Sequence, residues 1–122
     1  MVQHRSMLTV ADNSGAKKIM VIGIPAKGRS RTATLGEIIT GVVKTADPRG
    51  NVKSAEIVKA VLVRARKEIK REDGSYIRFS DNAVVVVDKD KNPRATRIFG
   101  PIAREVKDKG FTKIISMASE VV

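Results

Sequence analysis

The sequence predicts a mainly β fold, built as one small antiparallel barrel. Val and Ile together number 28 and Leu only three, a bias that suits pleated strands better than helix interiors. Short apolar runs alternate with clusters of turn-forming residues. The expected strands are residues 8–10, 18–24, 38–43, 57–63, 76–79, 83–87 and 113–116. A closed barrel is favoured over a sandwich, since a sheet this small would leave exposed edges.

Length and charge indicate one folded domain, residues 1–122, with a polyanionic partner. A chain of 122 residues is of ordinary size for a single domain. It has 24 Lys and Arg against 13 Asp and Glu, which gives a net charge of +11. The excess is spread over both halves of the chain, so we expect it on the folded body and not on a basic tail.

Several classes of site lack the residues that they need. The chain has no Cys and a single His, His4, which excludes disulfides, thiolate metal sites and catalysis by a Ser-His-Asp triad. No apolar stretch approaches the roughly 20 residues of a membrane helix, and the first 25 residues show no export signal. We therefore expect a soluble protein with no membrane association, no metal and no cofactor.

One segment, residues 101–109, is predicted to be a helix. Pro101 suits a first helical turn, and Gly110 suits the position after a helix end. Ile102 and Val106 lie four residues apart, so both should pack on the barrel while Arg104 and Glu105 point away.

A β-hairpin is expected around Asp73 and Gly74. A two-residue loop there would pair apolar with charged side chains, so we favour a three-residue loop with Gly74 in the left-handed conformation. This register gives three cross-strand pairs: Ile69 with Ile77, Glu68 with Arg78, and Lys70 with Tyr76. Period-two alternation then places four charged residues on one face: Arg64, Arg66, Glu68 and Lys70. An ordinary solvated strand face explains these charges equally well.

A basic segment follows the second expected strand. Residues 23–30 nearly match the phosphate-binding loop G-x-x-x-x-G-K-S/T, but Arg29 replaces the lysine and no helix pattern follows. Nucleotide binding is therefore disfavoured. Lys27, Arg29 and Arg31 still suit contacts with the phosphate backbone of a nucleic acid. We expect the loop that carries them to become ordered chiefly when a polyanion binds it.

Catalytic chemistry has little support. Asp12 stands in the sequence Asp-Asn-Ser-Gly, which is typical of a turn whose side-chain oxygens bind nearby backbone amides. The other carboxylates are mostly interleaved with Lys and Arg, an arrangement that suits surface pairs better than a general acid and base. We expect no enzyme.

Four blocks of sequence, in order and without a long insertion, carry a family resemblance. They are residues 10–16 (VADNSGA), residues 60–63 with Asp73, Gly74, Phe79, Asn82, Val85 and Val86 at their spacing, residues 96–105 (TRIFGPIARE), and residues 113–116 (KIIS). On these blocks the chain resembles, over its full length, the universal large-subunit ribosomal protein family numbered fourteen. The resemblance implies a closed five-stranded β-barrel with a projecting β-ribbon and short C-terminal helices.

The resemblance also implies a function and partners. It implies a structural constituent of the large ribosomal subunit that binds large-subunit ribosomal RNA and the large-subunit proteins numbered three and nineteen. It implies contact with small-subunit ribosomal RNA at inter-subunit bridges, and with a ribosome silencing factor. We expect ribosomes of the cytoplasm, with organellar ribosomes as the alternative. A free-standing basic RNA-binding regulator is the alternative function, although it would explain only the charge.

Two groups of residues are expected to make these contacts. RNA contacts are assigned to dispersed cations: Lys17, Lys18, Lys27, Arg29, Arg31, Lys44, Arg49, Lys53, Arg64, Arg66, Lys67, Arg71 and Arg78. Four aromatic residues, with no basic-aromatic interleaving, argue against stacking on unpaired bases. Protein and bridge contacts are assigned to a C-terminal region of mixed charge: Thr96, Arg97, Arg104, Lys107 and Lys113.

Overall fold

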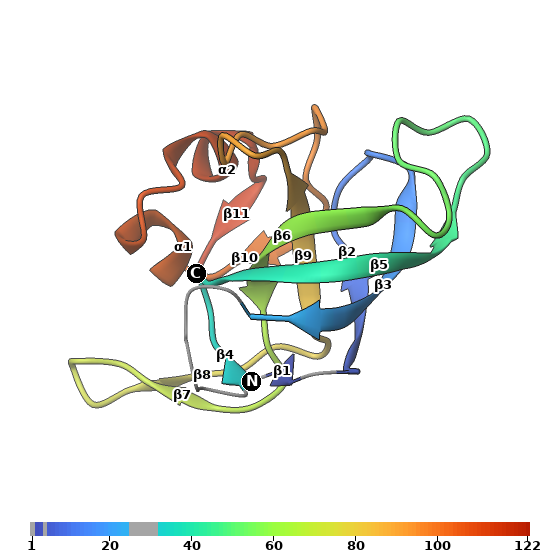
Figure 1. Ribbon diagram of the computed structural model, residues 1–122. Helices are drawn as coiled ribbons and strands as arrows, with labels where there is room; N and C mark the ends of the chain where they lie inside the picture. The colour runs from blue at the N-terminus through green and yellow to red at the C-terminus, as the bar shows by residue number, and fades with distance from the viewer. Residues whose placement is uncertain (1, 4, 25–31) are drawn as a thin grey trace.

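Five strands form a closed barrel in the computed structural model, which describes residues 2–3, 5–24 and 32–122 (Figure 1). The barrel strands are β2 (Met7–Val10), β3 (Ala16–Gly23), β5 (Ile38–Ala46), β6 (Ile57–Arg64) and β9 (Ala83–Val87), which pair in the order β2-β3-β5-β6-β9. The predicted barrel is confirmed. Two short strands, β1 (Val2–Gln3) and β4 (Thr32–Ala33), pair with each other outside it.

The prediction of a wholly antiparallel barrel is wrong, because β9 closes the barrel by pairing with β2 in parallel. Thr9 lies beside Ala83 and Val10 beside Val84. The other four pairs of neighbours are antiparallel. A ring of five strands cannot alternate direction all the way round, so one neighbouring pair must run parallel.

Side chains of alternating residues fill the barrel. In β3, Ile19 and Val21 are buried, while Lys18 is exposed and Met20 partly exposed. Leu8, Ile39 and Leu62 join them in one hydrophobic cluster. This alternation is typical of a barrel with an apolar interior and a solvent-exposed outer surface.

A second hydrophobic cluster lies on the outer side of β6 and β9. The residues of β9 are all buried, because Val84 and Val86 point into the barrel while Val85 and Val87 belong to the second cluster. The C-terminal segment covers this side with β10 (Pro101–Ile102), α1 (Glu105–Asp108), α2 (Thr112–Met117) and β11 (Glu120–Val121). Strands β10 and β11 pair in parallel. Figure 1 shows α1 and α2 grouped on this side of the barrel.

Two predictions about the C-terminal segment are wrong. Residues 113–116 are helical within α2, because burial of Ile114 and Phe111 against the second cluster overrides the β propensity of Ile114 and Ile115. The predicted helix 101–109 begins later, since Pro101 and Ile102 pair as a strand. Ile102 and Val106 are buried as expected, whereas Glu105 is only partly exposed and does not point away.

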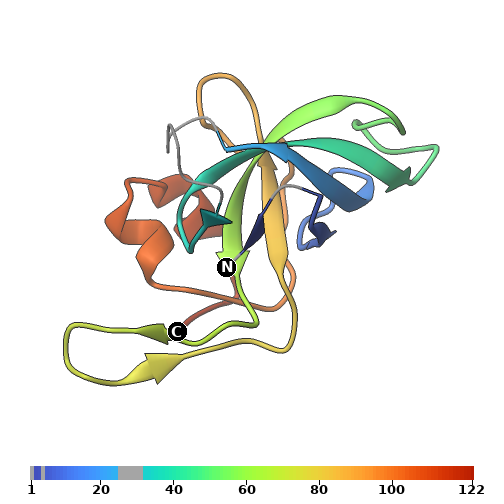
Figure 2. The same cartoon turned by 60° about the horizontal axis from the view of Figure 1, so that its bottom comes forward.

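The predicted hairpin register is confirmed. In β7 (Ile69–Lys70) and β8 (Tyr76–Ile77), Ile69 pairs with Ile77 and Lys70 with Tyr76. Gly74 has a φ of +90°, as the three-residue loop requires. The strand expected over residues 76–79 is shorter, and ends at Ile77. The ribbon projects from the barrel (Figure 2).

Within the described residues, no helix is long and apolar enough to cross a membrane.

Candidate nucleic-acid interface

Three of the predicted RNA contacts lie on the outside of the barrel. Lys17 and Lys18 in β3 and Lys44 in β5 are exposed. Other residues of the same strands are buried, so the side chains of these three lysines point out of the barrel towards solvent. The strands β2, β3, β5 and β6 contain no Asp or Glu. The sheet therefore presents cations to a partner without a carboxylate in the same strands.

Arg49 and Lys53 lie in the exposed loop between β5 and β6. Carboxylates shape this loop: the Arg49 N–H donates to Asp47 Oδ1 at 2.9 Å, and the Lys53 N–H donates to Glu56 Oε2 at 3.1 Å. The Lys53 amide, together with Arg94, holds the pKa of Glu56 below its ordinary value. The loop backbone thus has partners of its own, which leaves the two cationic side chains on the surface.

A contact between two glycines fixes the position of this loop. A Cβ on Gly15, whose φ is +107°, would lie 2.5 Å from the Cα of Gly50. The Asp47 N–H donates to the carbonyl of Gly15 at 2.7 Å, and the Asn51 N–H donates to that of Ser14 at 2.9 Å. Only residues without a side chain allow the two backbones to come this close. Residues 12–15 therefore anchor the loop that carries Arg49.

The ribbon and its base carry three further predicted contacts. Arg66, Lys67 and Arg78 are exposed. The Arg66 N–H donates to Asn82 Oδ1 at 2.9 Å, which holds the base of the ribbon. Arg78 Nη1 lies 4.0 Å from Glu68 Oε1, and both side chains are more than half exposed. Such a pair contributes little to stability, so Arg78 can change partners at low cost.

Two predicted RNA contacts, Arg64 and Arg71, have partners within the protein. Arg64 Nε lies 3.3 Å from Asp81 Oδ1, and its Nη1 donates to the Phe99 carbonyl at 3.3 Å. Arg71 Nη2 donates to Glu105 Oε1 at 2.9 Å and to the Val122 carbonyl at 2.5 Å. Both arginines join the ribbon or its base to the C-terminal segment. Their contact with RNA stays a prediction.

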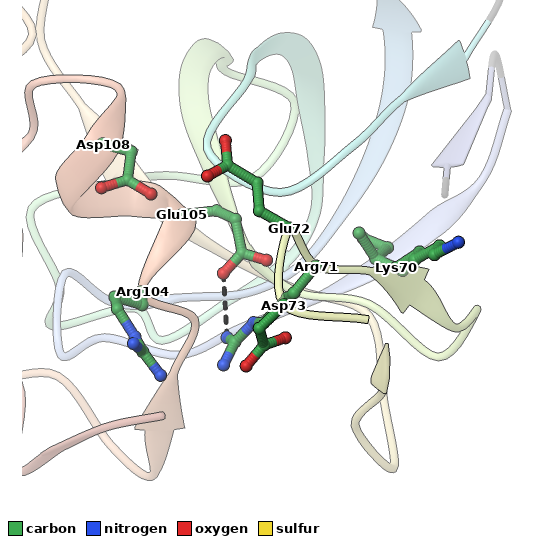
Figure 3. A pocket seen from close by; sticks show the side chains of 8 residues that line it. Lys70, Arg71, Glu72, Asp73, Arg104, Glu105 and Asp108 are labelled. Atoms are coloured by element: carbon green, nitrogen blue, oxygen red, sulfur yellow. Dashed lines mark hydrogen bonds and ion pairs between the residues drawn. The ribbon is translucent and has the colours of Figure 1, made fainter. Parts of the chain in front are cut away.

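A pocket of about 350 Å³ lies where the ribbon meets α1 (Figure 3). Figure 3 shows Arg71 reaching Glu105 across it, with Arg104 and Asp108 on the helix side. The residues that line it are Ile69, Lys70, Arg71, Glu72, Asp73, Arg104, Glu105 and Asp108. Charges of both signs line the pocket, so it does not favour a phosphate group.

Lys27, Arg29 and Arg31 lie outside the described residues. Their assignment as RNA contacts rests on the sequence alone.

Asp12 has a structural role, which confirms the turn interpretation. Its Oδ1 accepts from the Ser14 N–H at 3.1 Å and from Ser14 Oγ at 2.6 Å, and its Oδ2 accepts from the Val86 N–H at 2.9 Å. Burial raises the pKa of Asp12 above its ordinary value of 3.8, against the effect of these hydrogen bonds. Within the described residues, no group of three or more His, Cys, Asp or Glu is placed to hold a metal ion.

The predicted protein and bridge contacts are exposed, and Asn13 positions two of them. Asn13 Oδ1 accepts from the N–H groups of Thr96 and Arg97 at 3.0 Å each, and its Nδ2 donates to Thr96 Oγ1 at 3.0 Å. Arg104 precedes α1, Lys107 lies in α1 and Lys113 lies in α2; all three are exposed.

Sequence reasoning missed two features of this surface. The exposed Lys59 of β6 extends the barrel cations, and its position between buried Val58 and Ala60 was the signal that could have found it. The role of Asn13 spans 83 residues of sequence to Thr96, and nothing in the local sequence indicates it.

Comparison with known proteins agrees with this architecture. The profile of the family described as ribosomal protein L14p/L23e matches residues 1–122. The large ribosomal subunit protein uL14 of Aquifex aeolicus (strain VF5) is 56% identical over 122 residues, which cover 100% of both chains. The chain therefore belongs to the ribosomal protein L14p/L23e family, and it is a structural protein of the large ribosomal subunit, not an enzyme.

Proposed function

We propose that the chain binds large-subunit ribosomal RNA chiefly through phosphate contacts made by dispersed Lys and Arg side chains. One observation carries the proposal: strands β2, β3, β5 and β6 expose Lys17, Lys18, Lys44 and Lys59 and contain no carboxylate. Exposed ammonium groups neutralise phosphates without reading sequence. Lys27, Arg29 and Arg31, which lie outside the described residues, are proposed to bind in the same way, as are the loop cations Arg49 and Lys53 and the cations of the ribbon and its base, Arg66, Lys67 and Arg78.

The C-terminal surface is proposed to face the other subunit and protein partners. Thr96, Arg97, Arg104, Lys107 and Lys113 would contact small-subunit ribosomal RNA at bridges and a ribosome silencing factor. Cations alternate there with Glu105 and Asp108, an arrangement that favours contacts of fixed orientation over uniform phosphate binding. The large-subunit proteins numbered three and nineteen are proposed as neighbours, and the cytoplasm as the location of these ribosomes.

The salt dependence of RNA binding tests the phosphate mechanism. If about six to ten phosphates are neutralised, affinity for large-subunit ribosomal RNA should fall on the order of 10³ to 10⁵-fold between about 50 and 200 mM salt. The triple variant Lys17→Ala, Lys18→Ala, Lys44→Ala should bind more weakly and flatten the log–log salt slope by about two to three.

A matched triple variant provides the control. Lys89, Lys91 and Lys109 are also exposed, but each lies within two residues of an Asp. Replacing these three by Ala should change the salt slope less than the barrel variant does. Equal slopes for the wild type and the barrel variant would contradict the proposal.

Sedimentation distinguishes this function from the alternative of a free-standing regulator, since a ribosomal protein should comigrate with large subunits after a moderate salt wash.

A further inference from the structure

Tyr76 is an aromatic side chain that lies open to solvent on the projecting ribbon. It is the one Tyr of the chain, and it is 62% exposed. Its hydroxyl group has no hydrogen-bond partner among the residues that the structure describes. The ribbon extends away from the barrel (Figure 2), which leaves the ring accessible to a partner.

The hairpin register turns Tyr76 outward between cations. On one face of the ribbon, Ile69 and Ile77 are partly buried against the barrel core. Successive residues of a strand point to opposite faces, so Lys70 and Tyr76, which pair across the hairpin, lie on the other face. Arg78 follows two residues after Tyr76 and is exposed as well. The ring therefore has a cationic neighbour on each chain of the ribbon.

Both cations are available to a phosphate group. Within the described part of the chain Lys70 has no ion pair, and Figure 3 shows its ammonium group directed away from Glu105 and Asp108. Arg78 has one carboxylate neighbour, Glu68, at 4.0 Å, and both side chains are more than half exposed. A pair this long and this exposed contributes little, so it does not compete with a phosphate.

We propose that Tyr76 stacks on an unpaired base of large-subunit ribosomal RNA, while Lys70 and Arg78 bind the phosphates beside that base. Proteins that hold unpaired nucleotides combine these two elements, an aromatic face for the base and cations for the backbone. The proposal rests on the proposed RNA-binding function. It adds to the phosphate contacts one contact whose strength does not depend on charge.

The hairpin creates this site without a local pattern in the sequence. Basic and aromatic residues are not interleaved along the chain, and Lys70 becomes a neighbour of Tyr76 only across the turn. Of the other aromatic rings, Phe111 is buried and Phe79 packs against the barrel core. Phe99 is 53% exposed but lies on the C-terminal surface. Stacking is therefore confined to one position, in an interface that otherwise binds phosphates.

Two substitutions at Tyr76 test the stacking contact through affinity for large-subunit ribosomal RNA. Tyr76→Val removes the ring but keeps an apolar residue that favours strands. Loss of one stack between a base and an aromatic side chain corresponds to a fall in affinity of about 5 to 150-fold, which we expect for this variant. Tyr76→Phe keeps the ring and should bind nearly as tightly as the wild type.

The salt dependence of the same affinities separates stacking from charge. Tyr76→Val should leave the log–log salt slope unchanged because the ring releases no counterion, whereas Lys70→Ala should flatten the slope by about one. Phe99→Val is the matched control, since it removes an exposed ring from the surface proposed to face the other subunit. Wild-type affinity in Tyr76→Val, or an equal loss in Tyr76→Phe or Phe99→Val, would overturn the proposal. A flat salt response of the wild type would instead contradict the proposed phosphate mechanism.

Photo-crosslinking in assembled large subunits identifies the partner of the ring. Azidophenylalanine replaces Tyr76 in the full-length chain, and the subunits that contain it are irradiated. RNA adducts are mapped by stops in reverse transcription, and protein adducts by mass spectrometry. The expected product is an adduct to an unpaired nucleotide of large-subunit ribosomal RNA. An adduct to a protein, an adduct to paired nucleotides alone, or no adduct would overturn the proposal.

Discussion

The barrel core and the second hydrophobic cluster, which the C-terminal segment covers, are both apolar, but different interactions hold the two regions together. Every barrel strand is hydrogen-bonded to a neighbour on each side. The C-terminal segment has scattered backbone bonds to the barrel, such as Ala103 N–H to the Val63 carbonyl at 3.0 Å and Phe99 N–H to the Ala11 carbonyl at 2.6 Å. It is held further by side-chain burial on β6 and β9, by the two-residue pairing of β10 with β11, and by side-chain bonds from Asn13, Arg64 and Arg71. Backbone hydrogen bonds between strands depend little on any one side chain. A single substitution should therefore destabilise the C-terminal segment more than it destabilises the barrel.

The same contrast separates the cations. The barrel lysines Lys17, Lys18 and Lys44 are exposed, whereas Arg64 and Arg71 have side chains that are 13% and 19% exposed and bind within the protein. Guanidinium groups suit this task, since several N–H donors point in fixed directions. The barrel lysines are thus available to a partner, whereas Arg64 and Arg71 join the ribbon and its base to the C-terminal segment.

Arg71→Ala should have the largest effect, because it removes the bonds to Glu105 and Val122 at once. It also leaves the Glu105 carboxylate, which is 23% exposed, without its cation. We expect the free energy of unfolding to fall by about 2 kcal/mol, a value reduced for partial exposure. Hydrogen exchange should become faster in residues 98–122 and stay slow in the barrel strands.

Arg78→Ala is the control for that experiment. Arg78 is 71% exposed and lies 4.0 Å from its carboxylate partner, so its loss should change the free energy of unfolding by less than about 0.5 kcal/mol. Equal acceleration of exchange in the barrel and in residues 98–122 would show that Arg71 does not support the C-terminal segment separately.

Asp12→Asn should have the next largest effect. An amide group would face either the Val86 N–H or the Ser14 donors with hydrogens of its own, so one buried donor loses its acceptor. We expect a loss of about 1 to 2 kcal/mol at neutral pH, measured by denaturant unfolding.

The pH dependence of the Asp12 variant gives a second measurement. Because burial raises the pKa of Asp12 above 3.8 in the folded state, the wild type is most stabilised by this group below 3.8. It loses that stability as the pH rises through the folded-state value. The stability difference between wild type and variant should therefore shrink over this range. The exposed Asp90→Asn substitution is the control, and a difference that grows with pH would contradict the assignment.

Sequence alone predicted the barrel well and the C-terminal segment poorly, for physical reasons. Alternation in the barrel strands and the Asp73-Gly74 turn are local signals, so strand positions and the hairpin register followed from them. The helical state of residues 113–116 depends on burial of Ile114 by residues far away in the sequence. The intramolecular roles of Arg64 and Arg71 likewise depend on partners 17 to 51 residues away, such as Asp81 and Val122. Local composition carries no record of such contacts.

Arg97→Glu should have the smallest effect on stability and the clearest effect on function. Asn13 binds the backbone N–H of Arg97, and the side chain is exposed, so charge reversal leaves the bond in place. We expect a change in the free energy of unfolding of less than about 0.5 kcal/mol. The variant should still enter large subunits, because the proposed RNA contacts lie elsewhere. Its large subunits should join small subunits, or bind the silencing factor, several-fold more weakly, as measured on sucrose gradients and by factor binding.

The control for Arg97 is Lys89→Glu, the charge reversal of another exposed cation outside the proposed contact residues. Both variants lose a cation, so a general electrostatic effect on ribosomal RNA would weaken both alike. A specific contact would weaken subunit joining in the Arg97 variant alone. If that variant folded normally but failed to enter large subunits, Arg97 would belong to the RNA-binding surface. The residues that bind RNA would then be the cations without intramolecular partners in both regions, and not the cations of the barrel as opposed to those of the C-terminal segment.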